Sequence, residues 1–435
     1  MGSSKPVIAA ITVIGALAGA IVLRAEAAAL EQQISAPFGT FSGVEYLSYT
    51  GRFTGVTSKG AFDVPYEIVA PIEPLLGNGT VLMEPPHFAF GAVGRDIVLG
   101  RDLLFNSGFS YAAVGFGGNG LNVLDPAATP ITIAGEQVAD PGVPNPAAVL
   151  DFELLVQFVD TLKADPDATA ILGSNLTFYS FGISQTSAVQ LQILLGPEGQ
   201  GLFEFNLMTL RFWPAVINPE PFDRLSGDFA PPSGIGRTIF VNTESEVIRS
   251  DAEQFRTAAD DLNYRVYEIA GAPHFPQPPP LNPLDYNPVI RAAFVAGDNW
   301  IRWGVEPPLS LTIDETSGVD PVYGFETGIE RDINGNALGG IRLPDVELGS
   351  ALFIATNFVV PIPGIDPLFF GLWVDLQCEP LADGSVRFRN HGQYVSPFSQ
   401  HANALVSQGY LLASDAEAMK AAAAQSSVGK RGNCD

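Results

Sequence analysis

Hydrophobic positions along the chain fall into short runs that are separated by turns rich in Gly and Pro. Apolar or alternating runs predict strands at residues 43–49, 62–70, 80–84, 111–116, 176–181, 237–242 and 264–270. Apolar residues at helical spacing predict helices over residues 145–162, 186–195, 289–303 and 415–424. Strands that alternate with helices are typical of a mostly parallel sheet with both faces covered. We therefore expect an α/β fold.

Two stretches interrupt this alternation. Residues 196–236 are rich in Phe and Pro, contain Trp213 and lie between two predicted strands. They favour a lid-like insertion over a pocket, with a simple surface excursion as the alternative. From residue 309 to residue 435 the chain is rich in Pro and Gly and has helices near its end. We expect this C-terminal extension to pack on the same core.

The first 27 residues have the pattern of a targeting segment. Lys5 precedes an apolar run over residues 6–23, which Arg24 and Ala25-Glu26-Ala27 follow. A basic start, an apolar stretch and a small-x-small site predict a secretory signal peptide, and residues 28–435 then form the main domain. The alternative is an uncleaved membrane anchor over residues 6–23. Either way, we expect a secreted or extracytoplasmic protein.

Composition excludes several classes of function. The chain has 435 residues, with 22 basic against 47 acidic residues and a net charge of -25. This acidity excludes a nucleic-acid partner, because phosphate binding needs clustered Lys and Arg. Cys378 and Cys434 lie far apart, so they exclude a zinc ribbon or iron–sulfur site and leave one optional disulfide or two free thiols. His391 and His401 are not at metal-ligand spacing, and we expect neither a metal nor a cofactor.

A candidate nucleophile lies between a predicted strand and a predicted helix. Gly182-Ile183-Ser184-Gln185 has the context of a nucleophile elbow, a tight turn that raises a serine above the end of a sheet. The helix N-terminus adds backbone N–H donors beside it. Gly108-Phe109-Ser110 has the same short motif, but a strand follows it, so we interpret Ser110 as structural. The common elbow has Gly two positions after the serine, where this chain has Thr186.

A serine nucleophile needs a base and an acid that orients the base. Among the four histidines, His274 follows the last predicted core strand in a turn of small residues, whereas His87 lies upstream of the serine. The acid is expected after the strand at residues 237–242, where Glu244 and Glu246 are both candidates. Glu246 lies deeper in the loop and is favoured, and Glu244 remains the alternative.

The negative oxygen that forms during such a reaction needs two N–H donors. One is expected from the backbone of Gln185. The other should come from the loop after residues 80–84. Because Pro85 and Pro86 have no N–H, the donor there is His87 or Phe88.

With these residues in place, the chain resembles the "alpha/beta hydrolase domain-containing" proteins, a poorly characterised, esterase-like group. The resemblance starts from Phe-Gly-Ile-Ser-Gln at 181–185, Val-Asn-Thr-Glu-Ser-Glu at 241–246 and Glu-Ile-Ala-Gly-Ala-Pro-His at 268–274. Further similar segments are residues 300–304, 307–308, 339–345, 394–395, 405–412 and 415–416. The resemblance covers nearly all of the chain after residue 27 and implies an α/β-hydrolase fold in one unit. It also implies a triad of Ser184, Glu244 or Glu246, and His274 in the chain order serine, acid, histidine.

We therefore expect a secreted serine hydrolase that cleaves a neutral, fairly apolar carboxylic ester through an acyl-enzyme. The partner is a small-molecule ester, and a membrane is involved only if residues 6–23 remain as an anchor. Two alternatives stay open. One is a hydrolase-fold protein that binds a ligand or partner without turnover. The other is an amidase or acyltransferase that uses the same triad.

Overall fold

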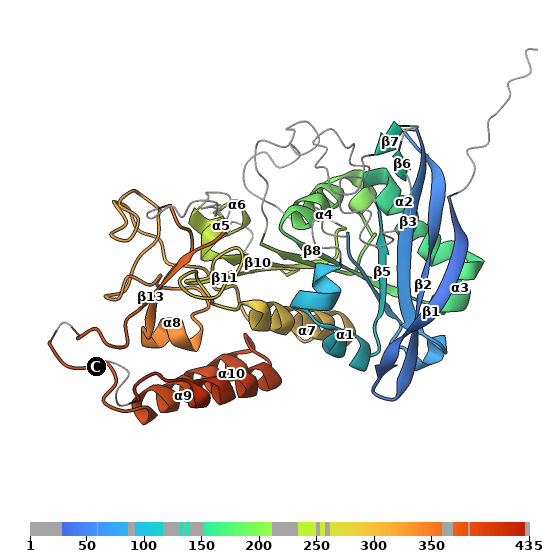
Figure 1. Cartoon of the computed structure of the whole chain (residues 1–435). Coiled ribbons are helices and arrows are strands. Elements are labelled where there is room, and N and C mark those ends of the chain that lie inside the picture. The colour runs from blue at the N-terminus through green and yellow to red at the C-terminus, as the bar shows by residue number, and fades with distance from the viewer. Residues whose placement is uncertain are drawn as a thin grey trace, which may run out of the picture.

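The computed structural model describes residues 28–58, 60–85, 92–115, 131–133, 136–138, 152–210, 234–248, 253–256, 262–358, 369–381 and 383–430. Within these residues one large sheet organises the molecule (Figure 1), with neighbouring strands in the order β1-β2-β3-β5-β4-β8-β9-β10-β11. Its strands are β1 (Ala29–Phe41), β2 (Val44–Thr57), β3 (Gly60–Pro71), β4 (Thr80–Met83), β5 (Ser110–Val114), β6 (Ile131–Ile133), β7 (Glu136–Val138), β8 (Thr177–Ile183), β9 (Phe205–Thr209), β10 (Arg237–Thr243) and β11 (Tyr264–Ile269).

The sheet has an antiparallel end and a parallel end. The pairs β1–β2, β2–β3 and β3–β5 are antiparallel, and every pair from β5 and β4 through to β11 is parallel. The carboxyl ends of parallel strands meet at one edge of a sheet, which is where ligands bind in α/β folds. The predicted α/β class with a mostly parallel sheet is confirmed.

Alternate side chains of the core strands divide between two apolar clusters, one on each face of the sheet. On β10, for example, Phe240 belongs to one cluster, and Ile239 and Val241 belong to the other. The Phe240 face is covered by α2 (Phe152–Ala164), α3 (Pro166–Leu172), α4 (Gln185–Leu195) and α6 (Glu253–Arg256). The opposite face is covered by α1 (Arg101–Asn106) and α7 (Asn287–Trp303).

The chain after residue 309 packs along the β11 edge and against α7. Leu311 and Ile341 form parallel bridges to β11, and Ile313, Val346 and Phe353 belong to the same apolar cluster as α7. The elements of this part are α8 (Pro344–Leu348), β12 (Ala351–Ile354), β13 (Leu372–Asp375), α9 (Gly392–Gln408) and α10 (Ala413–Gln425). Figure 1 shows α9 and α10 as a pair on the α7 side of the molecule.

The structure differs from the sequence prediction over part of residues 196–236. Residues 205–209 form β9, a fully buried strand that is paired on both sides, by β8 and β10. This part of the predicted lid is therefore sheet core. Both faces of β9 are covered, so its sequence lacks the alternation that marks a half-buried strand. The remaining stretch, residues 211–233, lies outside the described residues.

The targeting segment over residues 1–27 also lies outside the described residues. In the part of the chain that is described, no helix combines the length and hydropathy needed to cross a membrane.

Candidate active site

The turn between β8 and α4 presents Ser184 at the carboxyl edge of the sheet. β8 ends at Ile183, α4 begins at Gln185, and Ser184 between them has φ 56° and ψ -121°. Positive φ is costly for a residue with a side chain and persists only where surrounding contacts hold it. One such contact is the hydrogen bond of 3.0 Å from the Ser184 N–H to the carbonyl of Thr209 on β9. The geometry is that of a nucleophile elbow.

Two neighbours of Ser184 explain why this sharp turn is possible. A Cβ at Gly182 would lie 2.9 Å from the backbone nitrogen and 2.8 Å from the Cα of Ser187, so only glycine lets α4 start this close to β8. Thr186, which replaces the common glycine, is fully buried. Its hydroxyl donates to the Ile183 carbonyl (2.9 Å) and accepts from the Ile183 N–H (3.0 Å). The Thr186 side chain therefore ties the elbow together.

His274 lies beside the serine, in the turn after β11. Its Nε2 is 3.0 Å from the Ser184 Oγ. The imidazole is fully buried, and the hydroxyl of Tyr286 donates a hydrogen bond of 2.5 Å to the His274 carbonyl. The side chain and the backbone of His274 are thus both held in place.

Helix α5 (Glu244–Ile248) carries both candidate acids, and they have different partners. The Oε1 of Glu246 is 2.6 Å from the His274 Nδ1. The Oε2 of Glu246 accepts from the backbone N–H of Thr243 (3.0 Å) and from its hydroxyl. Glu244 instead accepts from the Gly271 N–H (2.7 Å) and from Arg331 (2.6 Å). Glu246 is therefore the acid that contacts the histidine.

The resulting chain of contacts can move a proton. With Glu246 ionised, the Nδ1–H of His274 donates to its carboxylate, which leaves the Nε2 lone pair free to accept the proton of the Ser184 hydroxyl. All three side chains are at least 96% buried, since Ser184 is 3% exposed, His274 0% and Glu246 4%. Burial lowers the effective dielectric constant around these contacts and strengthens each of them.

Of the two predicted N–H donors, the structure describes only the first, Gln185. Gln185 is the first residue of α4, and an N–H in the first turn of a helix has no partner within the helix. It is therefore available to a negative oxygen near Ser184. His87 and Phe88, the candidates for the second donor, lie outside the described residues.

Sequence reasoning missed Glu84, which anchors the chain just after β4. This fully buried carboxylate accepts from the N–H groups of Gly94 (2.6 Å) and Arg95 (3.2 Å), at the start of the π-helical turn η2 (Gly94–Val98). Burial raises the pKa of Glu84 to about 7, against the opposing effect of these two hydrogen bonds. An acidic residue directly after an apolar strand was the available sequence signal.

The other histidines within the described residues lie elsewhere. His391 contacts the carbonyls of Val428 and Ala424, and His401 contacts the carbonyl of Arg342. Ser110 is the first residue of β5, so it has no elbow geometry.

A family model described as an alpha/beta hydrolase domain matches residues 67–421. The chain belongs to this alpha/beta hydrolase family. The resemblance inferred from short motifs is confirmed, and family membership supports a hydrolase activity.

Solved structures similar to this chain include several esterases. They include an arylesterase (14% identity, TM-score 0.28), the esterase Est22 (13%, 0.31) and an esterase from Pyrobaculum calidifontis (15%, 0.28). These matches cover 45%, 51% and 45% of this chain, and 65%, 71% and 66% of the respective partners. The chain thus spans just under two thirds of the arylesterase. No curated protein matches the chain.

Proposed function

We propose that this member of the alpha/beta hydrolase family is a serine esterase that cleaves neutral, fairly apolar carboxylic esters through an acyl-enzyme. One observation carries the proposal. The Ser184 Oγ lies 3.0 Å from one nitrogen of His274, while the other nitrogen lies 2.6 Å from Glu246. A nucleophile, a base and an orienting acid joined by successive hydrogen bonds are what acyl transfer requires.

The first half-reaction forms the acyl-enzyme. The Ser184 Oγ attacks the ester carbonyl carbon as its proton passes to the Nε2 of His274. The carbonyl oxygen becomes negative and accepts from the Gln185 N–H. Glu246 stabilises the resulting imidazolium. The C–O bond to the alcohol then breaks, and the Nε2 returns its proton to the departing alcohol oxygen.

The second half-reaction releases the acid. A water molecule attacks the acyl carbon, His274 accepts one of its protons, and the bond to the Ser184 Oγ breaks. The serine oxygen recovers the proton from the Nε2. The net change is ester plus water to carboxylic acid plus alcohol, and the protein ends as it began.

The surroundings of His274 support an apolar substrate. The rings of Phe275 and Phe369 lie 4.5 Å and 5.1 Å from the imidazole, and Phe370 lies 6.1 Å from Phe275. All three phenylalanines are half-buried. This aromatic wall favours an apolar group beside the base, and the net charge of -25 disfavours an anionic substrate.

We also propose that the protein is exported and that residues 1–27 are removed. Cys378 is disulfide-bonded, which supports an oxidising compartment. Cys434, the other member of the predicted pair, lies outside the described residues. Intact-mass analysis of protein from the native host tests this proposal. Cleavage predicts a chain that begins near residue 28, and an intact chain in the membrane fraction would favour the anchor.

An activity-based label tests the enzyme assignment. A fluorophosphonate probe should label the wild-type protein, and Ser184→Ala should abolish both the label and the hydrolysis of short- and medium-chain nitrophenyl esters. Ser110→Ala is the matched control and should keep both. Labelling that persists in Ser184→Ala would overturn the assignment. A folded wild-type protein with neither label nor turnover would favour ligand binding without catalysis.

A separate measurement is needed to identify the molecule that accepts the acyl group. Added alcohol or amine should leave the free acid as the main product if water is the acceptor. A predominant new ester or amide would indicate an acyltransferase, and faster cleavage of the matched amide than of the ester would indicate an amidase.

A further inference from the structure

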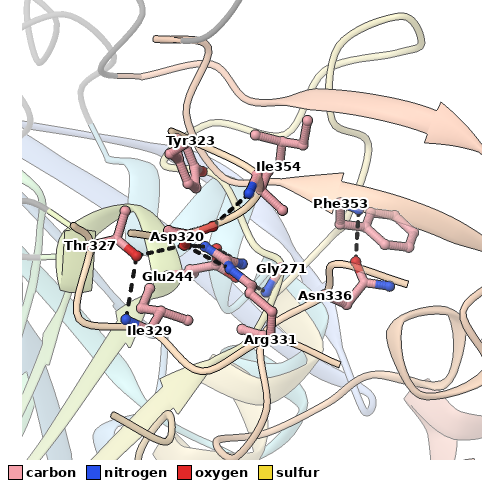
Figure 2. Close-up of polar contacts among 12 residues, drawn as sticks. Glu244, Gly271, Asp320, Tyr323, Thr327, Ile329, Arg331, Asn336, Phe353 and Ile354 are labelled. Atoms are coloured by element: carbon pink, nitrogen blue, oxygen red, sulfur yellow. Dashed lines mark hydrogen bonds and ion pairs between the residues drawn. The ribbon is translucent and has the colours of Figure 1, made fainter. Parts of the chain in front are cut away.

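A buried ion-pair network joins the C-terminal extension to the turn that carries His274 and the helix that carries Glu246 (Figure 2). At its centre, Arg331 donates to the Glu244 Oε1 (2.6 Å) and, through its Nε, to the Asp320 Oδ2 (2.9 Å). These side chains are almost completely buried, with 3% of Arg331, 0% of Glu244 and 1% of Asp320 exposed. None of the three takes part in the proposed reaction.

Glu244 is where three segments meet. Its backbone begins α5, two residues before Glu246. Its Oε2 accepts from the N–H of Gly271, which begins the histidine turn, while its Oε1 accepts from Arg331. One carboxylate thus fixes the acid helix and the histidine turn to each other and to the extension.

The extension presents Arg331 in a fixed position. Asp320 holds the guanidinium and is itself held by the hydroxyl of Thr327 (2.6 Å) and the N–H of Val322 (2.8 Å). The guanidinium also lies over the ring of Tyr323, 5.3 Å from its centroid. Because these contacts already fix the Arg331 guanidinium, it loses little further conformational entropy when it binds Glu244.

The C-terminal extension also packs directly against the turn that carries His274. Gly271 has φ +75°, and a Cβ there would lie 3.0 Å from Phe353 and 3.1 Å from Val346, both in the extension. The extension therefore contacts the start of the turn through apolar side chains and reaches the same residue through Arg331 and Glu244.

We propose that Arg331 and Glu244 are positioning residues that hold Glu246 and His274 in hydrogen-bonding register, so that the segment of the C-terminal extension that carries Arg331 supports the triad. The inference rests on the proposed function. Burying two carboxylates and a guanidinium carries a large desolvation cost, and apolar side chains of similar size often stabilise a fold as well. A role in alignment accounts for this choice of side chains, because charged hydrogen bonds fix geometry more tightly than apolar contacts do.

Kinetics of Glu244→Gln and Arg331→Met test the proposal. In Glu244→Gln, the amide nitrogen must face Arg331 or the Gly271 N–H, and both are donors, so one of the two links is lost. We expect kcat to fall about 10- to 100-fold with KM within about twofold, because alignment rather than ester binding is impaired. Arg331→Lys keeps the charge but not the fork of donors, and it should recover part of the loss seen in Arg331→Met.

The matched control is another ion pair between the core and the extension. Arg291 on α7 pairs with Asp415 on α10 (2.7 Å), and neither contacts Ser184, Glu246 or His274 within the described residues. Arg291→Met should leave kcat within about twofold. Thermal denaturation of every variant shows that the assays compare folded proteins. If Arg331→Met does not fold, Glu244→Gln and Arg331→Lys, which keep the side-chain volume, carry the comparison.

A double-mutant cycle separates alignment from general stability. In a Glu246→Gln background there is no acid left to align, so adding Arg331→Met should lower the residual kcat by less than about twofold. Full additivity, or single variants that match Arg291→Met, would overturn the inference. That outcome differs from failure of the proposed function, in which Ser184→Ala itself would keep the activity.

Discussion

The two halves of the candidate site are built in different ways. The nucleophile half is compact in sequence, because the contacts that shape the elbow join residues between 182 and 190, with further hydrogen bonds to Thr209 on β9. The acid–histidine half is assembled from distant segments. Glu246 and His274 are 28 residues apart, and Arg331 reaches Glu244 across 87 residues.

This difference determines where each half is vulnerable. The elbow depends on sterics, since Ser187 and Gln190 occupy the space that a Cβ at residue 182 would need. The acid–histidine half depends on charged hydrogen bonds between elements that pack together only in the complete fold. Substitutions can therefore damage each half separately.

The largest expected effect comes from removing the charge of Glu246, in the acid–histidine half. Glu246→Gln should lower kcat by up to about 10⁴-fold, because a neutral amide neither holds the His274 Nδ1–H in place nor stabilises the imidazolium. Steady-state kinetics on an activated nitrophenyl ester measures the loss. Glu244→Gln on the same helix is the comparison and should lose far less. If the two losses were equal, the assignment of Glu246 as the acid would be wrong.

The next largest effect is expected from a substitution in the nucleophile half. In Gly182→Ala the new methyl group meets the Ser187 backbone, which cannot move without shifting α4. Overpacking of this kind costs about 1–3 kcal/mol of folding free energy, and displacing Ser184 by about 1 Å lowers kcat about 100-fold.

Gly392→Ala provides the matched control for this prediction. Gly392 is exposed and its nearest contact would be a side-chain atom of Asn390 at 3.2 Å, so denaturation midpoint and kcat should both stay near the wild-type values. A Gly182→Ala protein with wild-type kcat would show that the elbow has more room than these distances indicate.

The same contrast explains what the sequence could predict. Strand, turn and helix around Ser184 were readable because the pattern is local, and β10 and β11 placed the acid and the histidine after the correct strands. The sequence favours Glu246 but leaves Glu244 as an alternative, because both begin one short helix and only their partners differ. One partner, Arg331, lies in a Pro/Gly-rich stretch with no pattern that marks it.

The errors in the fold have similar physical causes. β9 lies in a region that resembled an insertion, because its five residues are buried on both faces and show no period. β1 was not predicted, because this strand, which among the described strands pairs with β2 alone, carries many polar and exposed residues. The lid-like stretch over residues 211–233 and the donor role of His87 stay predictions.

The smallest effect on turnover is expected at Glu84, which supports the chain near the elbow from a neighbouring strand. Burial raises the pKa of this carboxyl from 4.5 to about 7, so the folded state disfavours the ionised form. Its contribution to stability is complete below pH 4.5 and is lost as the pH rises to about 7, a change of about 3 kcal/mol. Glu84→Gln should remove this part of the pH dependence and leave kcat within about twofold.

Thermal denaturation at intervals from pH 4.5 to pH 8 measures the effect as the difference between the wild-type protein and Glu84→Gln. Glu45→Gln alters an exposed carboxylate and should keep the wild-type slope. Identical slopes in wild type and Glu84→Gln would mean that Glu84 stays ionised in the fold. A large loss of kcat in Glu84→Gln would instead show that the nucleophile half also depends on a distant support, so that the two halves differ in degree rather than in kind.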